Sequence, residues 1–300
     1  MPSHILKIEA EHDLQRLDVV LTQILPDAPS RSFVQKLIEG GHVAVNHKPS
    51  KSNYKVSAGD EIKVEIPKNF LTPTDIEPEN IPLDIFYEDD FLVVINKRSG
   101  MLVHPATGCY TGTLVNALLY HFKKLSNLNT DIRPGIVHRL DQETSGLILV
   151  AKDNKTHLAL AKQFEAHEVN KRYVALVEGK VEFDQGVVDA SIGRHPKHRD
   201  KKSVQDNDKA KDAVTFYEVL KRKDKVTLIA LFPQSGRTHQ LRVHMSHIHH
   251  SILGDEKYGK KSTFPRLALH AQSIGFTHPK TKQLIEFCSI VPKEFLDKVR

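Results

Sequence analysis

A segment with four prolines, from Pro67 to Pro82, divides the 300-residue sequence into two parts with different patterns of apolar and polar residues. The segment PKNFLTPTDIEPENIP is too polar and too often interrupted by proline to form a core element, because proline fixes φ and removes a backbone donor. We therefore expect residues 67–82 to be a linker. The segments on either side, residues 1–66 and 83–300, are predicted to be two domains, and together they are long enough to bury a sizeable core.

The composition predicts a cytoplasmic globular protein with a polyanionic partner. Hydrophobic residues make up 39% and charged residues 27%, and the net charge of +6 favours nucleic acid. The apolar runs at 91–95 and 147–151 are too short to span a bilayer, and the acidic N-terminal stretch is not that of a signal peptide. Cys109 and Cys288 form no C-x-x-C pattern, which predicts no disulfide framework.

Residues 14–66 have the pattern of two helices followed by short strands. The first helix is indicated by the apolar face of Leu14, Leu17, Leu21 and Ile24. After PDAPS, Ser30 is a suitable N-cap for a second helix that carries Phe33, Val34, Leu37 and Ile38. HVAVNHKPS and DEIKVEIP alternate between apolar and polar residues, as strands do. A compact α+β module is expected.

From Leu83 onward, strands are predicted to outnumber helices. DIFYEDDFLVVINK, RYVALVEG and VTLIALFP are typical of strands, and THQLRVHMSHIHH is typical of a helix. KTHLALAKQFEAHE predicts another helix, with Leu158, Ala161 and Phe164 on one side. Because no regular β-α-β alternation appears, the fold class expected is α+β with a mixed, mainly antiparallel sheet flanked by helices and loops.

Four polar islands lie among the predicted strands: NKRSGMLVHPATG (96–108), RPGIVHRLDQETSG (133–146), NKRYVAL (170–176) and SGRTHQLRVH (235–244). Each mixes cations, His or Gly with apolar flanks, as do loops that converge on a cleft. Asp141 is the strong carboxylate candidate among them, although lone Asp–Arg pairs are more often structural than catalytic. The basic run 195–203 is either a solvated loop or part of an RNA-binding surface.

Two other local patterns do not meet the requirements of a phosphate-binding or metal-binding site. GDEKYGKK resembles a P-loop, but Lys261 stands where the magnesium-binding Ser or Thr must be. The many histidines have no spacing typical of zinc ligands, so no metal is expected. These observations leave a basic cytoplasmic enzyme that acts on nucleic acid.

The islands are similar, in order, to the motifs of the RluA family of pseudouridine synthases. The H-R-L-D signature of the family resembles GIVHRLDQETSGLILVAK, and its first motif resembles NKRSGMLVHPATG. Its Lys/Arg-x-Tyr motif is similar to KRYVAL, and the motif that follows is similar to GRTHQLRVHM. Two further family motifs recur in order as GDEKYG and LALHA. Residues 14–66 resemble the S4 domain, a small RNA-binding module. VHPATG and SIGRHP are most similar to the RluD branch, which modifies a stem-loop of large-subunit ribosomal RNA.

The resemblance implies isomerisation of uridine to pseudouridine without a cofactor. It implies that Asp141 is the catalytic carboxylate, Arg242 its ionic partner and Tyr173 the aromatic ring that stacks on the target base. Arg139 would insert into the RNA and hold the flipped nucleotide. The other residues predicted to bind RNA or substrate are Lys97, His138, Arg237 and His239 in the catalytic domain and Arg31, Lys36, Lys48 and Lys51 in the S4-like module.

Alternatives remain open for these residues and for the function. His138 could stabilise the turn, Lys97 could cap a strand, Tyr173 could belong to the core, and Arg139 could contact only the RNA backbone. Arg98 replaces the proline that is common in the family. The same reaction at other large-subunit sites, as in the RluC branch, or in transfer RNA is an alternative, as is a non-catalytic ribosome-assembly factor. A monomer with RNA as partner and no membrane contact is expected.

Overall fold

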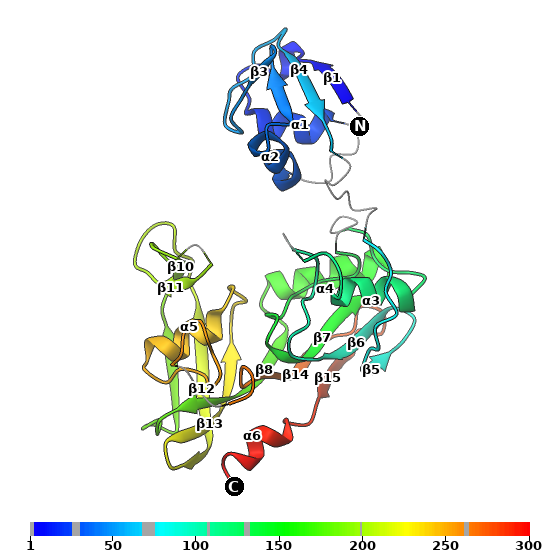
Figure 1. Cartoon of the computed structure of the whole chain (residues 1–300). Helices are drawn as coiled ribbons and strands as arrows, with labels where there is room; N and C mark the ends of the chain where they lie inside the picture. Colours follow the sequence, from blue (N-terminus) through cyan, green and yellow to red (C-terminus); the bar gives the residue numbers. More distant parts are fainter. Residues whose placement is uncertain are drawn as a thin grey trace. The chain divides into compact units, whose positions relative to one another are not determined.

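The computed structural model describes residues 3–25, 31–67, 76–106, 109–128, 133–198, 200–260 and 264–300 (Figure 1). Its contacts divide the chain into a small N-terminal unit and a large unit made of Pro78–Leu128 and Pro134–Arg300. Residues 68–75, half of the predicted linker, and the predicted N-cap Ser30 lie outside the described residues.

The small unit packs two helices against a four-stranded antiparallel sheet. Its strands are β1 (Ser3–Lys7), β2 (Val43–Val45), β3 (Lys48–Pro49) and β4 (Glu61–Glu65), in the order β1-β4-β2-β3. Its helices are the 3-10 turn η1 (Ala10–His12), α1 (Leu17–Ile24) and α2 (Arg31–Glu39). The apolar faces of α1 and α2 meet the inward side of the sheet in one core that includes Leu17, Leu21, Leu37 and Ile62. The helix–helix–strand order predicted from the sequence is confirmed.

Leu14 is not part of the first helix, contrary to the sequence-based prediction. Its backbone has φ +60°, its side chain is exposed, and its N–H donates to the carbonyl of Val56 at 2.8 Å. The helix begins only at Leu17, since pairing with the segment before β4 uses the backbone of Leu14. The strand β1 was not predicted either.

The large unit is built on one mixed sheet. Its strands are β5 (Ile85–Glu88), β6 (Leu92–Lys97), β7 (Ser145–Ala151), β8 (Asn170–Glu178), β9 (Gln185–Asp189), β12 (Val214–Lys223), β13 (Val226–Pro233), β14 (Leu269–Thr277) and β15 (Leu284–Cys288). Their order is β5-β6-β7-β14-β8-β13-β12-β9, and β15 pairs with β14. Among the described strands only the β7–β14 pair is parallel, which confirms the mainly antiparallel prediction.

The seam between β7 and β14 joins two halves of this sheet. Only Ser145 and Gly146 of β7 pair with His270 and Ala271 of β14. Gly146 has φ +113°, and a Cβ there would overlap the carbonyl oxygen of Ala271. The close approach of the two strands therefore requires glycine at this position.

Helices cover both halves of the sheet. They are α3 (Leu114–His121), α4 (Asn154–Glu165), α5 (Gln240–His247) and α6 (Lys293–Asp297). Figure 1 shows α4 over the β7 end of the sheet and α5 over the β12–β13 end, with β8 and β14 between them. A separate hairpin of β10 (Ile192–Arg194) and β11 (Lys202–Val204) stands beside α5, with the basic run 195–203 at its turn.

The predicted helix at 154–165 is confirmed as α4. Asp153 caps it by accepting the N–H groups of Lys155 and Thr156. His157 and Leu160 are buried and Phe164 packs against the core, whereas Leu158 is 53% exposed. Within the described parts of the chain, no helix combines the length and the apolar character needed to cross a membrane.

Candidate active site

A cavity of about 300 Å³ lies where the polar islands of the sequence meet. Its walls come from the loop before β7, from β8, from Leu269 of β14, and from the end of β13 with the start of α5. It is lined by Arg139, Asp141, Tyr173, Arg237, His239 and Arg242, among others. The structure therefore brings residues from three of the four islands together, although they are separated by up to about a hundred positions in the chain.

The loop that carries Asp141 is held from both sides. Gly135, with φ +72°, turns the chain so tightly that a Cβ would meet the carbonyl of Ala151. The apolar run after Asp141 is the strand β7, whereas before Asp141 Ile136 forms a single bridge with Val150. Leu140 is buried beside the carboxylate. The backbone of Asp141 is therefore anchored next to a central strand.

Lys97 is the main clamp on the other side of this loop. Its side chain is 1% exposed, and its ammonium donates to the carbonyls of Arg98, Met101 and Gln142 at 2.9–3.0 Å. Burial lowers the pKa of Lys97 to about 7, against the opposing effect of Glu143 and Asp141. This geometry does not fit the predicted contact of Lys97 with RNA. Lys97 instead joins the first island to the residue that follows Asp141.

Arg242 is shared between two carboxylates. Its Nε and Nη2 donate to the two oxygens of Asp255 at 2.8 Å each, and its Nη1 lies 3.4 Å from Asp141 Oδ2. Asp255 is fully buried and also accepts the N–H groups of Lys257 and Tyr258. The predicted contact between Arg242 and Asp141 is present, but the stronger, bidentate pair is with Asp255.

His239 faces the same carboxylate. Its Nε2 lies 4.0 Å from Asp141 Oδ2, and its Nδ1 is 2.7 Å from the hydroxyl of Tyr258. That hydroxyl accepts the N–H of Lys202, so its own proton is free to go to His239 Nδ1. Burial lowers the pKa of His239, while Asp141 acts to raise it. A neutral imidazole with its Nε2 proton toward Asp141 is consistent with these contacts.

Tyr173 closes the cavity from the side of β8. Burial raises the pKa of Tyr173, and the charge of Asp141 adds to this shift. The phenol therefore remains protonated at neutral pH. It offers an apolar ring face and a hydroxyl to whatever fills the cavity.

Arg139, Arg237 and His138 stand at the walls of the cavity with different degrees of constraint. Arg139 is exposed and, within the described residues, has no ion-pair partner, so it forms no pair with Asp141. Arg237 is held by the carbonyl of Asp212 at 3.1 Å. His138 accepts the N–H of Leu149 at 2.8 Å, and burial lowers its pKa to about 3. The contacts of His138 favour the turn-stabilising interpretation.

In the small unit, Arg31 differs from the lysines that were predicted to bind RNA with it. Its guanidinium donates to the buried carboxylate of Asp18 at 3.1 and 3.3 Å, a pairing that the sequence did not reveal. Arg31 is thus partly committed to the fold. Lys36, Lys48 and Lys51 are exposed on the second helix and the strand region after it.

Asp255 and Tyr258 were missed as members of the site. Both come from the segment GDEKYG, which was recognised only as a recurring motif and as a failed P-loop. Its position thirteen residues after Arg242 gives no local signal of contact. Only the turn after α5 brings Asp255 back to the guanidinium.

Comparisons with known proteins agree with this geometry. Residues 91–247 match the family model described as RNA pseudouridylate synthase, and residues 15–62 match the S4 domain. The chain belongs to the RNA pseudouridine synthase family. The uncharacterized RNA pseudouridine synthase YlyB of Bacillus subtilis is 42% identical over 96% of this chain and 94% of its own length.

Other relatives of the family cover a similar share of the chain. Ribosomal large subunit pseudouridine synthase D of Zymomonas mobilis is 40% identical over 98% of this chain and 95% of its own. The solved structure of human RNA pseudouridylate synthase domain containing 1 has a TM-score of 0.60 at 27% identity, over 73% of this chain and 86% of that one. The family match includes Asp141, Tyr173 and Arg242 within its boundaries.

Proposed function

We propose that this protein isomerises uridine to pseudouridine in large-subunit ribosomal RNA. The observation that carries the proposal is the contact of Asp141 with Arg242 in a cavity walled by Tyr173, in a chain that belongs to the pseudouridine synthase family. Relatives of about 40% identity over nearly the full length are named ribosomal large subunit pseudouridine synthase D. The S4 match adds a second element for binding RNA.

The reaction breaks the bond between N1 and C1′, turns the base within the cavity and joins C5 to C1′. A proton leaves C5, and one is gained at N1, so no external reactant is consumed. Asp141 is the group for the bond exchange, because among the described residues it is the carboxylate that lines the cavity, and its one contact to a guanidinium there is 3.4 Å long. Arg242 keeps this carboxylate ionised and in place as water is excluded.

The base needs support while it is detached from the sugar. Tyr173 would stack on it and is the candidate for handling the C5 proton. Arg139, exposed at the rim, would fill the gap in the RNA that the flipped nucleotide leaves. Lys97 and His138 fix the loop that carries the carboxylate, and precise positioning of this kind is a large share of the rate enhancement of enzymes.

Release of tritium from RNA labelled at C5 of uridine tests the proposal. The wild-type protein is expected to release tritium from a transcript of large-subunit ribosomal RNA, and Asp141→Asn is expected to release none above background. Transfer RNA transcripts form the second arm, because the same chemistry on transfer RNA is the nearest alternative. Equal background release by the two proteins from every transcript would instead indicate a non-catalytic RNA-binding factor.

A further inference from the structure

Lys171 is a charged residue of the cavity wall that the mechanism above does not use. It lies two positions before Tyr173 on β8, so both side chains are on the same face of the strand, about 7 Å apart along it. Lys171 is half-buried and lines the cavity beside Phe164 and His138. Within the described residues its ammonium has no hydrogen-bond or ion-pair partner, and only its backbone is paired, with β14.

Other buried lysines of the same unit show how unusual this is. The ammonium of Lys97 has three carbonyl partners, and that of Lys152 pairs with Glu88. Burial alone lowers the pKa of Lys171, with no carboxylate acting against it. Removing a cation from water without a counter-charge is unfavourable. An anionic group of a bound ligand beside Lys171 would restore this balance.

A second cavity shows where such a partner can lie. This cavity, of about 350 Å³, shares Lys171 and His167 with the first one and continues along Arg172, Gln234 and Ser273. Glu286 also lines it but forms no ion pair with Lys171. Lys171 thus lies between the cavity that would hold a base and a neighbouring cavity whose wall also includes Arg172.

We propose that the ammonium of Lys171 binds a backbone phosphate adjacent to the flipped-out uridine, an inference that rests on the proposed function. With the base against Tyr173, the backbone of the same nucleotide must leave the cavity along its wall. Lys171 lies on that wall, two residues before Tyr173 on the same face of β8. A phosphate supplies a full negative charge, whereas a base carbonyl is neutral and would leave the cation uncompensated. Lys171 would thereby hold the nucleotide in its extruded position.

Uncharged methylphosphonate linkages test this contact directly. RNA hairpins from the large subunit would carry one such linkage at each position from two nucleotides before to two after the target uridine. For the wild-type protein, one linkage is expected to lower kcat/KM about tenfold, as a charge-assisted hydrogen bond predicts. In Lys171→Met the same linkage should have no further effect, and Lys171→Arg should restore the sensitivity.

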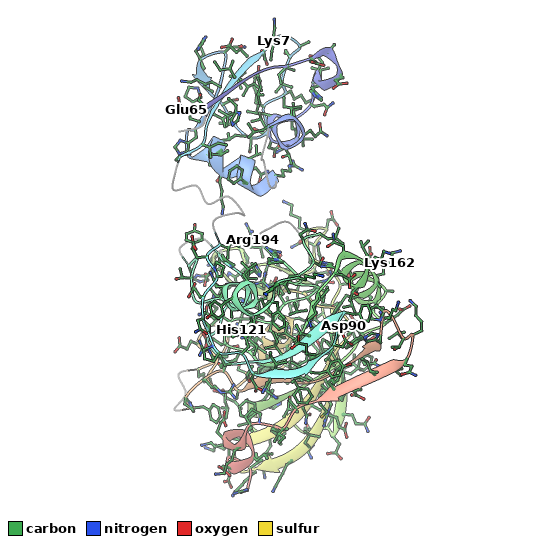
Figure 2. The ribbon with its side chains drawn as sticks, turned by 90° about the vertical axis from the view of Figure 1, so that its right-hand side faces the viewer. Lys7, Glu65, Asp90, His121, Lys162 and Arg194 are labelled. Carbon is green, nitrogen blue, oxygen red and sulfur yellow. The ribbon has the colours of Figure 1, made fainter. Side chains whose placement is uncertain are left out.

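Lys162→Met is the matched control, because Lys162 lies on α4 with its side chain in solvent (Figure 2). This variant should keep the wild-type response to every linkage. If Lys171→Met also keeps the full wild-type sensitivity at every linkage, the phosphate contact is wrong. Thermal melting adds a second readout: loss of an uncompensated charge should leave the melting temperature of Lys171→Met unchanged or raise it, whereas a clear decrease would reveal a structural role and overturn the proposal.

Binding separates this inference from the proposed catalytic function. The same RNA series can be titrated with Asp141→Asn and with the double variant Asp141→Asn/Lys171→Met, for which no turnover is needed. One linkage should raise the Kd of the first protein about tenfold and leave that of the second unchanged. If no transcript releases tritium, the proposed function fails, and this pair of titrations still decides the role of Lys171; equal responses of both proteins would exclude it.

Discussion

Each unit of the molecule contains a cluster of arginine and aspartate side chains, but the ratio of arginine to aspartate in one cluster is the reverse of that in the other. In the small unit one buried carboxylate, Asp18, accepts from two guanidinium groups, those of Arg16 and Arg31, at 3.0–3.3 Å. In the large unit one guanidinium, that of Arg242, serves two carboxylates, Asp255 and Asp141.

The difference separates a structural carboxylate from a reactive one. The side chain of Asp18 is fully buried, and the hydrogen bond from Arg16, followed by those from Gln35 and Arg31, lowers its pKa. Such a group stays ionised and has no free lone pair directed at a ligand. Asp141 is 18% exposed, faces a cavity and receives only one contact of 3.4 Å from a guanidinium that is already committed to Asp255. The shared arginine holds Asp141 without enclosing it.

Removing the shared arginine should have the largest effect. Arg242→Met leaves Asp255 as a buried charge without a counter-ion, and the free energy of unfolding should fall by about 3–5 kcal/mol. Tritium release should disappear as well, since Asp141 loses its cation. Urea denaturation and the release assay measure the two effects. A loss of stability below about 1 kcal/mol would show that Asp255 does not depend on Arg242.

Removing the charge of Asp255, so that Arg242 faces only one carboxylate, Asp141, tests the difference between the two clusters more sharply. Asp255→Asn replaces one of the two acceptor oxygens by an amide NH2 that cannot accept, so it frees one donor of Arg242 and removes the charge that holds the guanidinium, which should then turn toward Asp141. We expect kcat to fall about tenfold to a hundredfold because the reacting group is displaced, with little change in KM. Asp255→Glu, which keeps the charge, should restore part of kcat. An unchanged kcat in Asp255→Asn would mean that Asp255 has no positioning role.

The two units should also respond to acid in different pH ranges. Burial lowers the pKa of His138 to about 3, that of His270 to about 4 and also that of His157, all in the large unit. Each of these groups binds a proton in the unfolded state below about pH 6.5, so the stability of the large unit is fully present above that pH and declines as the pH falls toward 3.

The stability that Asp18 gives the small unit has a lower onset. Its pKa is lowered in the folded state, so its contribution is present above about pH 4 and is lost only as the pH falls further. Hydrogen exchange measured between pH 7 and pH 3 should therefore show loss of protection in β7 and α4 before α1 and α2. The reverse order would contradict the assignment of these acid-sensitive groups.

The smallest effect is expected for Arg31→Met. Arg31 is 49% exposed, and Arg16 and Gln35 remain bonded to Asp18, so the stability should fall by about 1 kcal/mol or less. Single replacements of the exposed Lys36, Lys48 and Lys51 by Met should each lower the slope of RNA affinity against salt by about one unit, and those of Lys48 and Lys51 should leave stability unchanged. A slope reduced as much by Arg31→Met as by the lysine variants would show that Arg31 also binds phosphate.

Local patterns were enough to predict most of the elements and the family. The alternating segments of residues 43–65 and the apolar runs of β6, β7 and β13 became strands as expected. The errors are at positions where tertiary contacts override local periodicity. Leu14 leaves the helix because its N–H pairs with Val56, and β1 was missed because its partner β4 lies more than fifty residues later in the chain.

Within the site, the motifs identified the residues that meet but not how they divide their contacts. The contact between Asp141 and Arg242 followed from the family resemblance and is present. Sequence spacing could not show that Asp255 takes two of the donors of Arg242, or that Lys97 is enclosed by carbonyls. These assignments depend on which groups are buried together, and that is set by packing between distant segments.

The parallel seam between β7 and β14 has a consequence for how the protein matures. Asp141 precedes β7, and its cation comes from beyond β13, so the pair closes only after residues 101 positions apart have been joined. Such non-local pairing is slow to form, and Ser145 and Gly146 contribute only two residue pairs to it. During synthesis the carboxylate therefore emerges before Arg242, and the cavity cannot close before the start of α5 and Leu269 of β14, which form part of its wall, have been made. Activity should therefore appear only after these C-terminal segments have joined the loop that carries Asp141.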